Sequence, residues 1–204
     1  DTLKQGFLDF QSAVNKIVGI LDSNQVSVNN TVDVSNMSNK ELYDYSVGII
    51  RDCLSNLDPD TNYNDMTNYE IIVLFSSNLS EFSELFDGDV TEFLNGLLQQ
   101  QTVLLSTDRD VFTDYLNYKQ IDEEDREDLF ADFDKGNGAA AMATVEMLSI
   151  DSQIEDLEKE NDQLSKDVIP GHYYMGVRLE EPNPESQKKI NENNRMISEL
   201  NVQK

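Results

Sequence analysis

Cysteine and histidine are nearly absent from this chain of 204 residues, which contains one of each, Cys53 and His172. One cysteine cannot form an internal disulfide, and zinc sites built from clusters of cysteine and histidine are excluded. Cys53 follows apolar residues at helical spacing, which predicts a buried and unreactive thiol. Glycine-rich phosphate loops and the G-x-S-x-G turn of a nucleophilic serine are also absent from the sequence. We therefore expect a protein that is not an enzyme and that has no cofactor, apart from the calcium considered below.

Long hydrophobic runs are missing as well. The apolar stretch at residues 71–75 is far shorter than the roughly 18–20 residues that cross a bilayer, so no membrane span is expected. The chain starts at Asp1 rather than at methionine, which a removed signal peptide, a maturation cleavage or artificial trimming would each explain. We favour an extracytoplasmic or secreted protein, or a virion component, over a cytoplasmic one.

Basic residues are scarce, because 15 lysines and arginines stand against 40 aspartates and glutamates, for a net charge of −25. Direct binding to nucleic acid depends on clustered basic residues that displace counterions, so it is not expected here. An anionic membrane surface would repel the chain for the same reason. The charge leaves one alternative open, an acidic inhibitor that mimics nucleic acid and occupies the groove of a basic protein.

What the sequence does contain is helical periodicity. Apolar residues recur every three or four positions through most of residues 1–138, which predicts an acidic bundle of about six helices. Ser38 followed by Glu41 has the spacing of a capping box at a helix start. A short segment of alternating valines is typical instead of a small β-hairpin turning at two asparagines. Its residues are Val26, Val28, Asn29, Asn30, Val32 and Val34.

Residues 139–204 have a narrower apolar pattern, which predicts a long helical hairpin. The first helix repeats apolar residues in alternating steps of three and four from Ala140 to Val168, and a second helix starts at Pro184. Such a thin stripe suits a helix that packs on one partner. Asn161 interrupts the stripe, and we expect it to face Asn193 or Asn194 of the returning helix, since buried amides need partners. A parallel coiled coil between two copies of the chain is the rival geometry. The full fold prediction is mainly all-α, a helical bundle with a small β-hairpin and a coiled-coil-like C-terminal hairpin.

The segment between these two helices, residues 169–183, is expected to be the tip loop of that hairpin. It carries aromatic, methionine and arginine side chains of the kinds that are enriched in the cores of protein interfaces. Packing back onto the parent domain is an equally good reading of the same residues. On the first reading the protein is a structural or assembly component that contacts a partner or itself. The expected interface residues are Ile154, Leu157, Asn161, Leu164, Tyr173, Tyr174, Met175 and Arg178.

An alternative function comes from residues 58–70, DPDTNYNDMTNYE. Asp58, Asp60 and Asn62 occupy the alternate positions that a helix–loop–helix calcium site uses, and Glu70 closes the run. Tyr63 stands where glycine is needed, and Glu70 falls one position late. The segment therefore resembles a distorted EF-hand with one inserted residue, which implies a calcium-responsive module. Asp and Asn also cap helices and shape turns, which explains the same residues without a metal.

Overall fold

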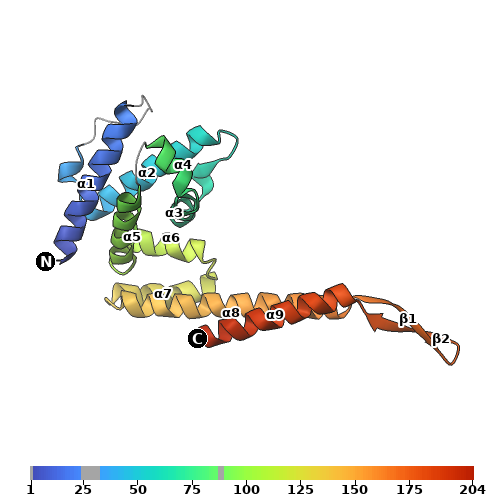
Figure 1. Cartoon of the computed structure of the whole chain (residues 1–204). Coiled ribbons are helices and arrows are strands. Elements are labelled where there is room, and N and C mark those ends of the chain that lie inside the picture. Colours follow the sequence, from blue (N-terminus) through green and yellow to red (C-terminus); the bar gives the residue numbers. More distant parts are fainter. Residues whose placement is uncertain (1, 24–32, 87–89) are drawn as a thin grey trace. The chain divides into compact units, whose positions relative to one another are not determined.

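The computed structural model describes residues 2–23, 33–86 and 90–204, and most of these residues are helical (Figure 1). Within these ranges the chain forms nine α-helices, two 3-10 helices and one antiparallel sheet of two strands. The predicted fold, mainly all-α with a small β-hairpin and a C-terminal helical hairpin, is confirmed. The chain divides into two compact units, Asp1–Met142 and Ala143–Lys204.

In its described ranges, the first unit contains seven α-helices, two 3-10 helices and the start of an eighth α-helix. The α-helices are α1 (Thr2–Ser23), α2 (Asn39–Leu57), α3 (Asn68–Ser77), α4 (Leu79–Leu85), α5 (Thr91–Leu105), α6 (Arg109–Tyr118) and α7 (Glu123–Asp134), with the 3-10 helices η1 (Val34–Asn36) and η2 (Tyr63–Asp65). Five residues of the predicted valine ribbon lie outside the described ranges: Val26, Val28, Asn29, Asn30 and Val32. Val34 is described, and it begins η1 rather than a strand. Asp33 accounts for this start, because its carboxylate accepts a hydrogen bond from the Ser35 N–H at 3.0 Å.

Local side-chain caps explain where several of these helices begin. The Ser38 hydroxyl accepts a hydrogen bond from the Glu41 N–H at 3.2 Å, and the Glu41 carboxylate accepts one from the Ser38 N–H at 2.7 Å. The predicted capping box is therefore confirmed. Thr67 and Glu70 form a second capping box at the start of α3. Asp108 caps α6 by accepting from two backbone N–H groups.

Contacting aromatic rings form part of the core of the first unit. The Phe75 ring meets Phe82 edge-on at a centroid distance of 4.7 Å and Phe93 at 5.7 Å. Phe93 in turn stacks on Phe10 of α1 at 6.2 Å. Close approach of α1 and α5 depends on Gly96, where a Cβ atom would lie 2.8 Å from Cδ2 of Phe10. A glycine is thus required at this helix crossing.

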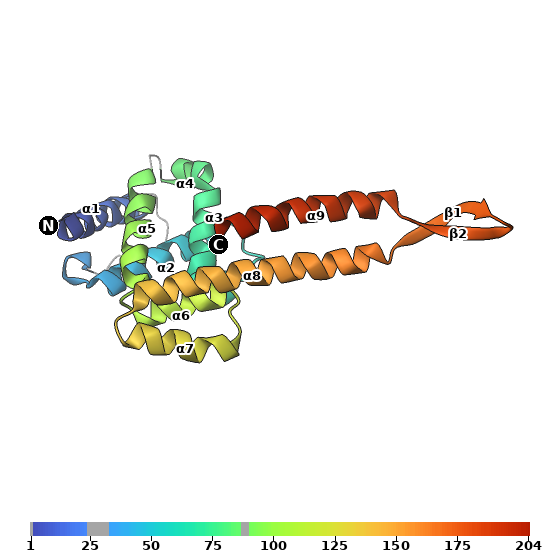
Figure 2. The ribbon, with the colours of Figure 1, turned by 90° about the horizontal axis from the view of Figure 1, so that it is seen from below.

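The second unit is a helical hairpin extended by a β-hairpin. Its elements are α8 (Gly138–Ser165), which begins in the first unit, β1 (Val168–Tyr174), β2 (Val177–Pro182) and α9 (Pro184–Gln203). The helices α8 and α9 lie side by side in both ribbon views (Figures 1 and 2). The two strands connect the end of α8 to the start of α9 and extend beyond both helices. Pro184 occupies the first turn of α9, as predicted, and Asn183 caps the helix.

Two details of the hairpin prediction are wrong. Residues 169–183 are not a loop, because all but the last of them belong to an antiparallel β-hairpin and its turn. Val168 is not the last seam residue of the first helix either, since α8 ends at Ser165 and Val168 starts β1. The strands form because a two-residue turn at Met175 and Gly176 brings apolar and β-branched residues into register on either side.

Candidate interaction surface

A two-residue turn, Met175-Gly176, connects the two strands of the β-hairpin. Met175 and Gly176 both have positive φ, at 50° and 83°, as a two-residue turn of type I′ requires. Tyr174 pairs with Val177 across this turn, and the next pair is Tyr173 with Arg178. Glycine adopts positive φ without strain, whereas Met175 adopts it at a steric cost. The turn twists the strands in the same sense as a β-sheet, which favours a narrow, regular hairpin.

A bulge between Pro170 and Tyr173 interrupts the first strand. Gly171 lies there with the Glu181 side chain packed against its Cα, where a Cβ atom would clash with that side chain. The Glu181 carboxylate accepts a hydrogen bond from the His172 N–H at 3.1 Å and lies 2.5 Å from His172 Nδ1. This hydrogen bond, aided by the negative charge, raises the pKa of His172 above its ordinary value. The glutamate thus joins the two strands across the irregular part of the ladder.

The side chains of this hairpin are mostly exposed, although many are apolar. Tyr173, Tyr174 and Met175 are 72%, 67% and 88% exposed. The Arg178 guanidinium lies 5.7 Å from the centre of the Tyr173 ring, at the distance of a weak cation–π contact. Four more apolar side chains of the hairpin are exposed: Val168, Ile169, Val177 and Leu179. Exposed apolar groups gathered in one place mark an interaction surface more often than an ordinary solvent face.

A polar clasp ties the base of the β-hairpin to α9. The Asp167 carboxylate accepts hydrogen bonds from Asn183 Nδ2 at 2.9 Å and from the Ser186 hydroxyl. The Asn183 N–H also donates to the Asp167 carbonyl at 3.1 Å. These bonds join Asp167 and Asn183, the two residues that flank the β-hairpin, at the start of α9, where a negative charge is favoured by the helix dipole. The hairpin is therefore anchored at its base while its tip remains exposed.

A network of amides joins α8 to α9, and it confirms the predicted pairing of Asn161. Asn161 Nδ2 donates to Asn194 Oδ1 at 3.0 Å, and Asn193 Nδ2 donates to Asn161 Oδ1 at 3.0 Å. Asn193 also contacts a carboxylate oxygen of Glu160 at 2.7 Å and is fully buried. Hydrogen bonds between these side-chain amides form only when the three positions face each other. The network therefore fixes the register of the two helices.

The other predicted interface residues of α8 lie along the same seam. Ile154 is buried, while Leu157 and Leu164 are half-buried. Leu157 lines a groove of about 370 Å³ together with Met196 and Leu200 of α9. These side chains are buried or half-buried within the chain, whereas the predicted interface residues at the tip of the hairpin are exposed.

The predicted calcium loop is held by local hydrogen bonds. Asp58 accepts a hydrogen bond from the Thr61 hydroxyl at 2.6 Å and one from the Asp60 N–H at 3.3 Å. The bond from Thr61 is the main cause that lowers the pKa of Asp58. The Asn62 side chain accepts from the Asn64 N–H at 3.2 Å and caps η2. Asp58 and Asn62 therefore act as turn-forming and capping residues in this structure.

The closing residue of that loop has a similar local role. The Glu70 carboxylate accepts from the Thr67 N–H at 2.7 Å as part of the capping box of α3. Arg51 of α2 holds the loop by donating to the carbonyls of Tyr63 and Met66. Among the described residues, no group of three or more His, Cys, Asp or Glu is arranged to hold a metal ion. The calcium site stays a prediction. These hydrogen bonds do not favour it, because they occupy side-chain oxygens that would have to bind the ion.

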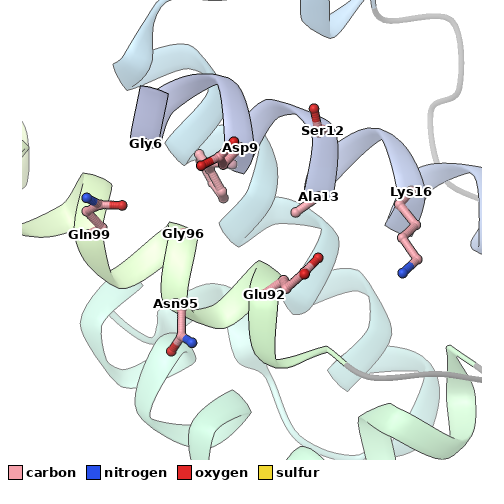
Figure 3. A pocket seen from close by; sticks show the side chains of 10 residues that line it. Gly6, Asp9, Ser12, Ala13, Lys16, Glu92, Asn95, Gly96 and Gln99 are labelled. Atoms are coloured by element: carbon pink, nitrogen blue, oxygen red, sulfur yellow. The ribbon is translucent and has the colours of Figure 1, made fainter. Parts of the chain in front are cut away.

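A cavity lies between α1 and α5 of the first unit (Figure 3). It measures about 450 Å³, and its lining combines two glycines with amide and charged side chains. Lys16 stands on α1, whereas Glu92, Asn95 and Gln99 stand on α5 (Figure 3). This lining contains no cysteine or histidine.

Comparisons with protein-family models, with curated proteins and with solved structures find no match for this chain. None of the helices in the described ranges is long and apolar enough to span a membrane.

Sequence reasoning found the apolar residues at the tip but missed their β-structure and their anchor. The dipeptide Met175-Gly176, placed between Tyr-Tyr and Val-x-Leu, was the available signal for a two-residue turn. The clasp at Asp167 had no signal in the sequence, because Asn183 and Ser186 are 16 and 19 positions away.

Proposed function

We propose that this protein is a non-enzymatic structural or assembly component, which contacts another protein chain through its C-terminal helical hairpin and the β-hairpin at the tip. The observation that supports this proposal is the exposure of apolar side chains on a hairpin that is clasped at its base. Tyrosine, as at Tyr173 and Tyr174, is among the residue types that dominate the binding energy of protein interfaces, and methionine, as at Met175, is enriched in them.

Energetics favour a partner for this hairpin. A two-stranded ribbon is only marginally stable in water, and it gains stability when one of its faces is covered. The ribbon here has seven exposed large apolar residues within residues 168–179. Burying one such side chain contributes about 1.5–3 kcal/mol, so covering even three of them would offset part of the entropy lost on association.

The design of the second unit also suits a projecting contact element. The amide network sets one register for α8 and α9, and the clasp at Asp167 fixes the strands to the start of α9. A rigid support lowers the conformational entropy that a contact element loses on binding. The helical hairpin thus acts as a stalk, by which we mean residues 143–165 and 184–203, and the β-hairpin acts as its contact tip.

The proposal is tested with the double substitution Tyr173→Ala/Tyr174→Ala in the full chain. We expect association with the partner or with a second copy to fall by at least about tenfold, since each tyrosine buries a large area in an interface. Helical circular dichroism and the melting temperature should stay unchanged. Val202→Ala is the matched control, because Val202 is an apolar residue of α9 that is 87% exposed.

The opposite pattern would contradict the proposal. If the double variant associates like the unaltered chain but melts at a lower temperature, the tyrosines serve the fold and the tip is not a contact surface. Association is measured by sedimentation velocity over a range of chain concentrations, and stability by thermal melting of the same samples.

A further inference from the structure

The sheet of the second unit has two strands, so in the described chain each strand has one unpaired edge. The two edges are not equivalent. On β1, Pro170 lacks an N–H group and a bulge follows it, so the ladder of hydrogen-bonding groups is broken. On β2, Val177–Pro182 is regular and its proline is the last residue. The edge of β2 is therefore the one that can accept a further strand.

The register of the hairpin identifies which groups of β2 face outward. In a hairpin with a two-residue turn, the pair that flanks the turn exchanges backbone hydrogen bonds, and every second pair after it does the same. Val177 flanks the turn opposite Tyr174. The backbone groups of Val177, Leu179 and Glu181 thus point to β1. Those of Arg178 and Glu180 point away from β1 and are free of pairing within the sheet.

From this edge we infer that the partner at the tip is a second copy of this chain, which adds its own β2 antiparallel to the first and forms a four-stranded sheet. This inference rests on the proposed function and names its partner. Three antiparallel registers bring outward groups of the two strands together. One sets Arg178 against Arg178, another sets Glu180 against Glu180, and the third sets Arg178 against Glu180 twice. The third register alone pairs opposite charges, and it is centred on Leu179.

The same register gathers the apolar side chains. Tyr174 and Val177 are opposite each other, and Leu179 follows two residues later, so the three share one face of the hairpin. Pairing about Leu179 places the two copies of this leucine directly opposite, in a pair without backbone hydrogen bonds, where side chains lie closest. The apolar groups of both copies then form one continuous patch, while the Arg178–Glu180 pairs lie on the other face.

The charge of the tip permits this contact. The whole chain has a net charge of −25, whereas residues 168–182 contain one arginine, one histidine and two glutamates. Two copies that meet at their tips therefore avoid most of the repulsion between acidic residues elsewhere in the chain. Edge pairing of short strands buries little area, so we expect a dimer at the weak end of specific interfaces, in equilibrium with the monomer.

Charge reversal in the full chain tests the register. Arg178→Glu turns both opposite-charge pairs into like-charge pairs, and so does Glu180→Arg, so each single variant should weaken the dimer by at least roughly tenfold. The double variant Arg178→Glu/Glu180→Arg restores both pairs and should dimerise again. A mixture of the two single variants should form a heterodimer, because their charges are complementary, whereas each variant alone should dimerise weakly. Lys188→Glu on α9 is the matched control and should dimerise normally.

Mixing the two single variants distinguishes a lost charge pair from a folding defect, because a misfolded variant would not dimerise in the mixture either. Arg178→Glu also removes the contact with the Tyr173 ring, but restoration by the second substitution or by the complementary variant cannot come from that contact. Sedimentation velocity gives the dimer fraction in each sample. If the single variants dimerise as well as the unaltered chain, or if neither the double variant nor the mixture recovers, the inferred register is wrong.

Disulfide cross-linking tests whether the two copies of Leu179 lie opposite each other. Opposite residues without backbone hydrogen bonds have Cα atoms about 4.5 Å apart, within the span of a disulfide. Leu179→Cys should therefore form a covalent dimer under mild oxidation. Tyr174→Cys, on the same face but on β1, should not. Cys53 is 1% exposed and adds little background. Equal cross-linking at both positions would overturn the register.

These outcomes separate the inference from the function on which it rests. If the tyrosine double variant loses self-association while charge reversal and cysteine cross-linking have no effect, the tip is a contact surface that uses a geometry other than pairing of the two β2 strands about Leu179. In that case the proposed function stands and the inferred β2 pairing is excluded. If neither set of variants changes association, both proposals fail.

Discussion

Replacing Asn193 by alanine should loosen α9 from α8 by a predictable amount. Asn193 is fully buried and donates to Asn161 at 3.0 Å and to Glu160 at 2.7 Å. A neutral hydrogen bond contributes about 1 kcal/mol and one to a charged group about 1.5–3 kcal/mol. Glu160 is exposed and Asn161 is half-buried, so water can replace the hydrogen bonds that both side chains lose. The net loss in the free energy that holds α9 on α8 is therefore about 2 kcal/mol.

Hydrogen exchange of the α9 amides is the assay, because it reports local opening of one helix in the intact chain. A loss of about 2 kcal/mol corresponds to exchange that is roughly thirtyfold faster. Asn191→Ala is the control, since Asn191 is an exposed asparagine of the same helix, and it should change the exchange rate little. Asn161→Leu/Asn193→Leu removes both amides together, and its exchange should be no faster than that of the unaltered chain.

Two results would refute this reasoning. Exchange in Asn193→Ala within twofold of the unaltered chain would mean that the amide network does not hold the helices together. Exchange in the double leucine variant as fast as in Asn193→Ala would mean that the loss does not come from an unpaired amide.

Three other parts of the chain give direct tests. Hydrogen bonding to Glu181 should raise the pKa of His172 above 6.5 in an NMR titration, and Glu181→Gln should return it to that value. Because the folded pKa is raised, the stabilisation by His172 is complete below pH 6.5 and is lost as pH rises through the folded pKa, provided that Glu181 stays ionised. Gly96→Ala should lower the free energy of urea unfolding by about 1–3 kcal/mol through overpacking. Gly19→Ala, with no atom within 4 Å of the added Cβ, should raise it by up to about 1 kcal/mol. Millimolar calcium should release no heat on titration into the chain, since Asp58, Asn62 and Glu70 use side-chain oxygens in turns and caps; heat that saturates at one ion per chain would contradict this.

The helices and their pairing were predictable because they depend on short-range pattern. Apolar spacing defined the seam of the C-terminal hairpin, and the cost of burying an unpaired amide placed Asn161 opposite Asn193 or Asn194. Ser38 and Glu41 identified a helix start for a similar reason, since both partners of a capping box lie within one turn. Each of these features is decided by residues close in sequence or by one strong energetic requirement.

The β-structure at the tip was harder to predict, because its sequence contradicts the usual strand rules. Pro170 and Gly171 both disfavour a strand, and the bulge that accommodates them is not visible in the pattern. The turn uses Met175 at a position where asparagine or aspartate is usual. Arg51, which donates to two carbonyls of the loop after α2, belongs to the same class of missed residues, since its partners are 12 and 15 positions away.

The mass of the chain in solution tests the central claim that the exposed apolar tip exists to be covered by another chain. We expect the unaltered chain to show a mass that rises from one copy toward two with increasing concentration in light scattering. The variant Tyr174→Ser/Leu179→Ser should keep the mass of one copy over the same range, with unchanged circular dichroism. A single-copy mass for both proteins at every concentration would contradict self-association through the tip, and a dimer that survives both substitutions would place the contact elsewhere on the chain.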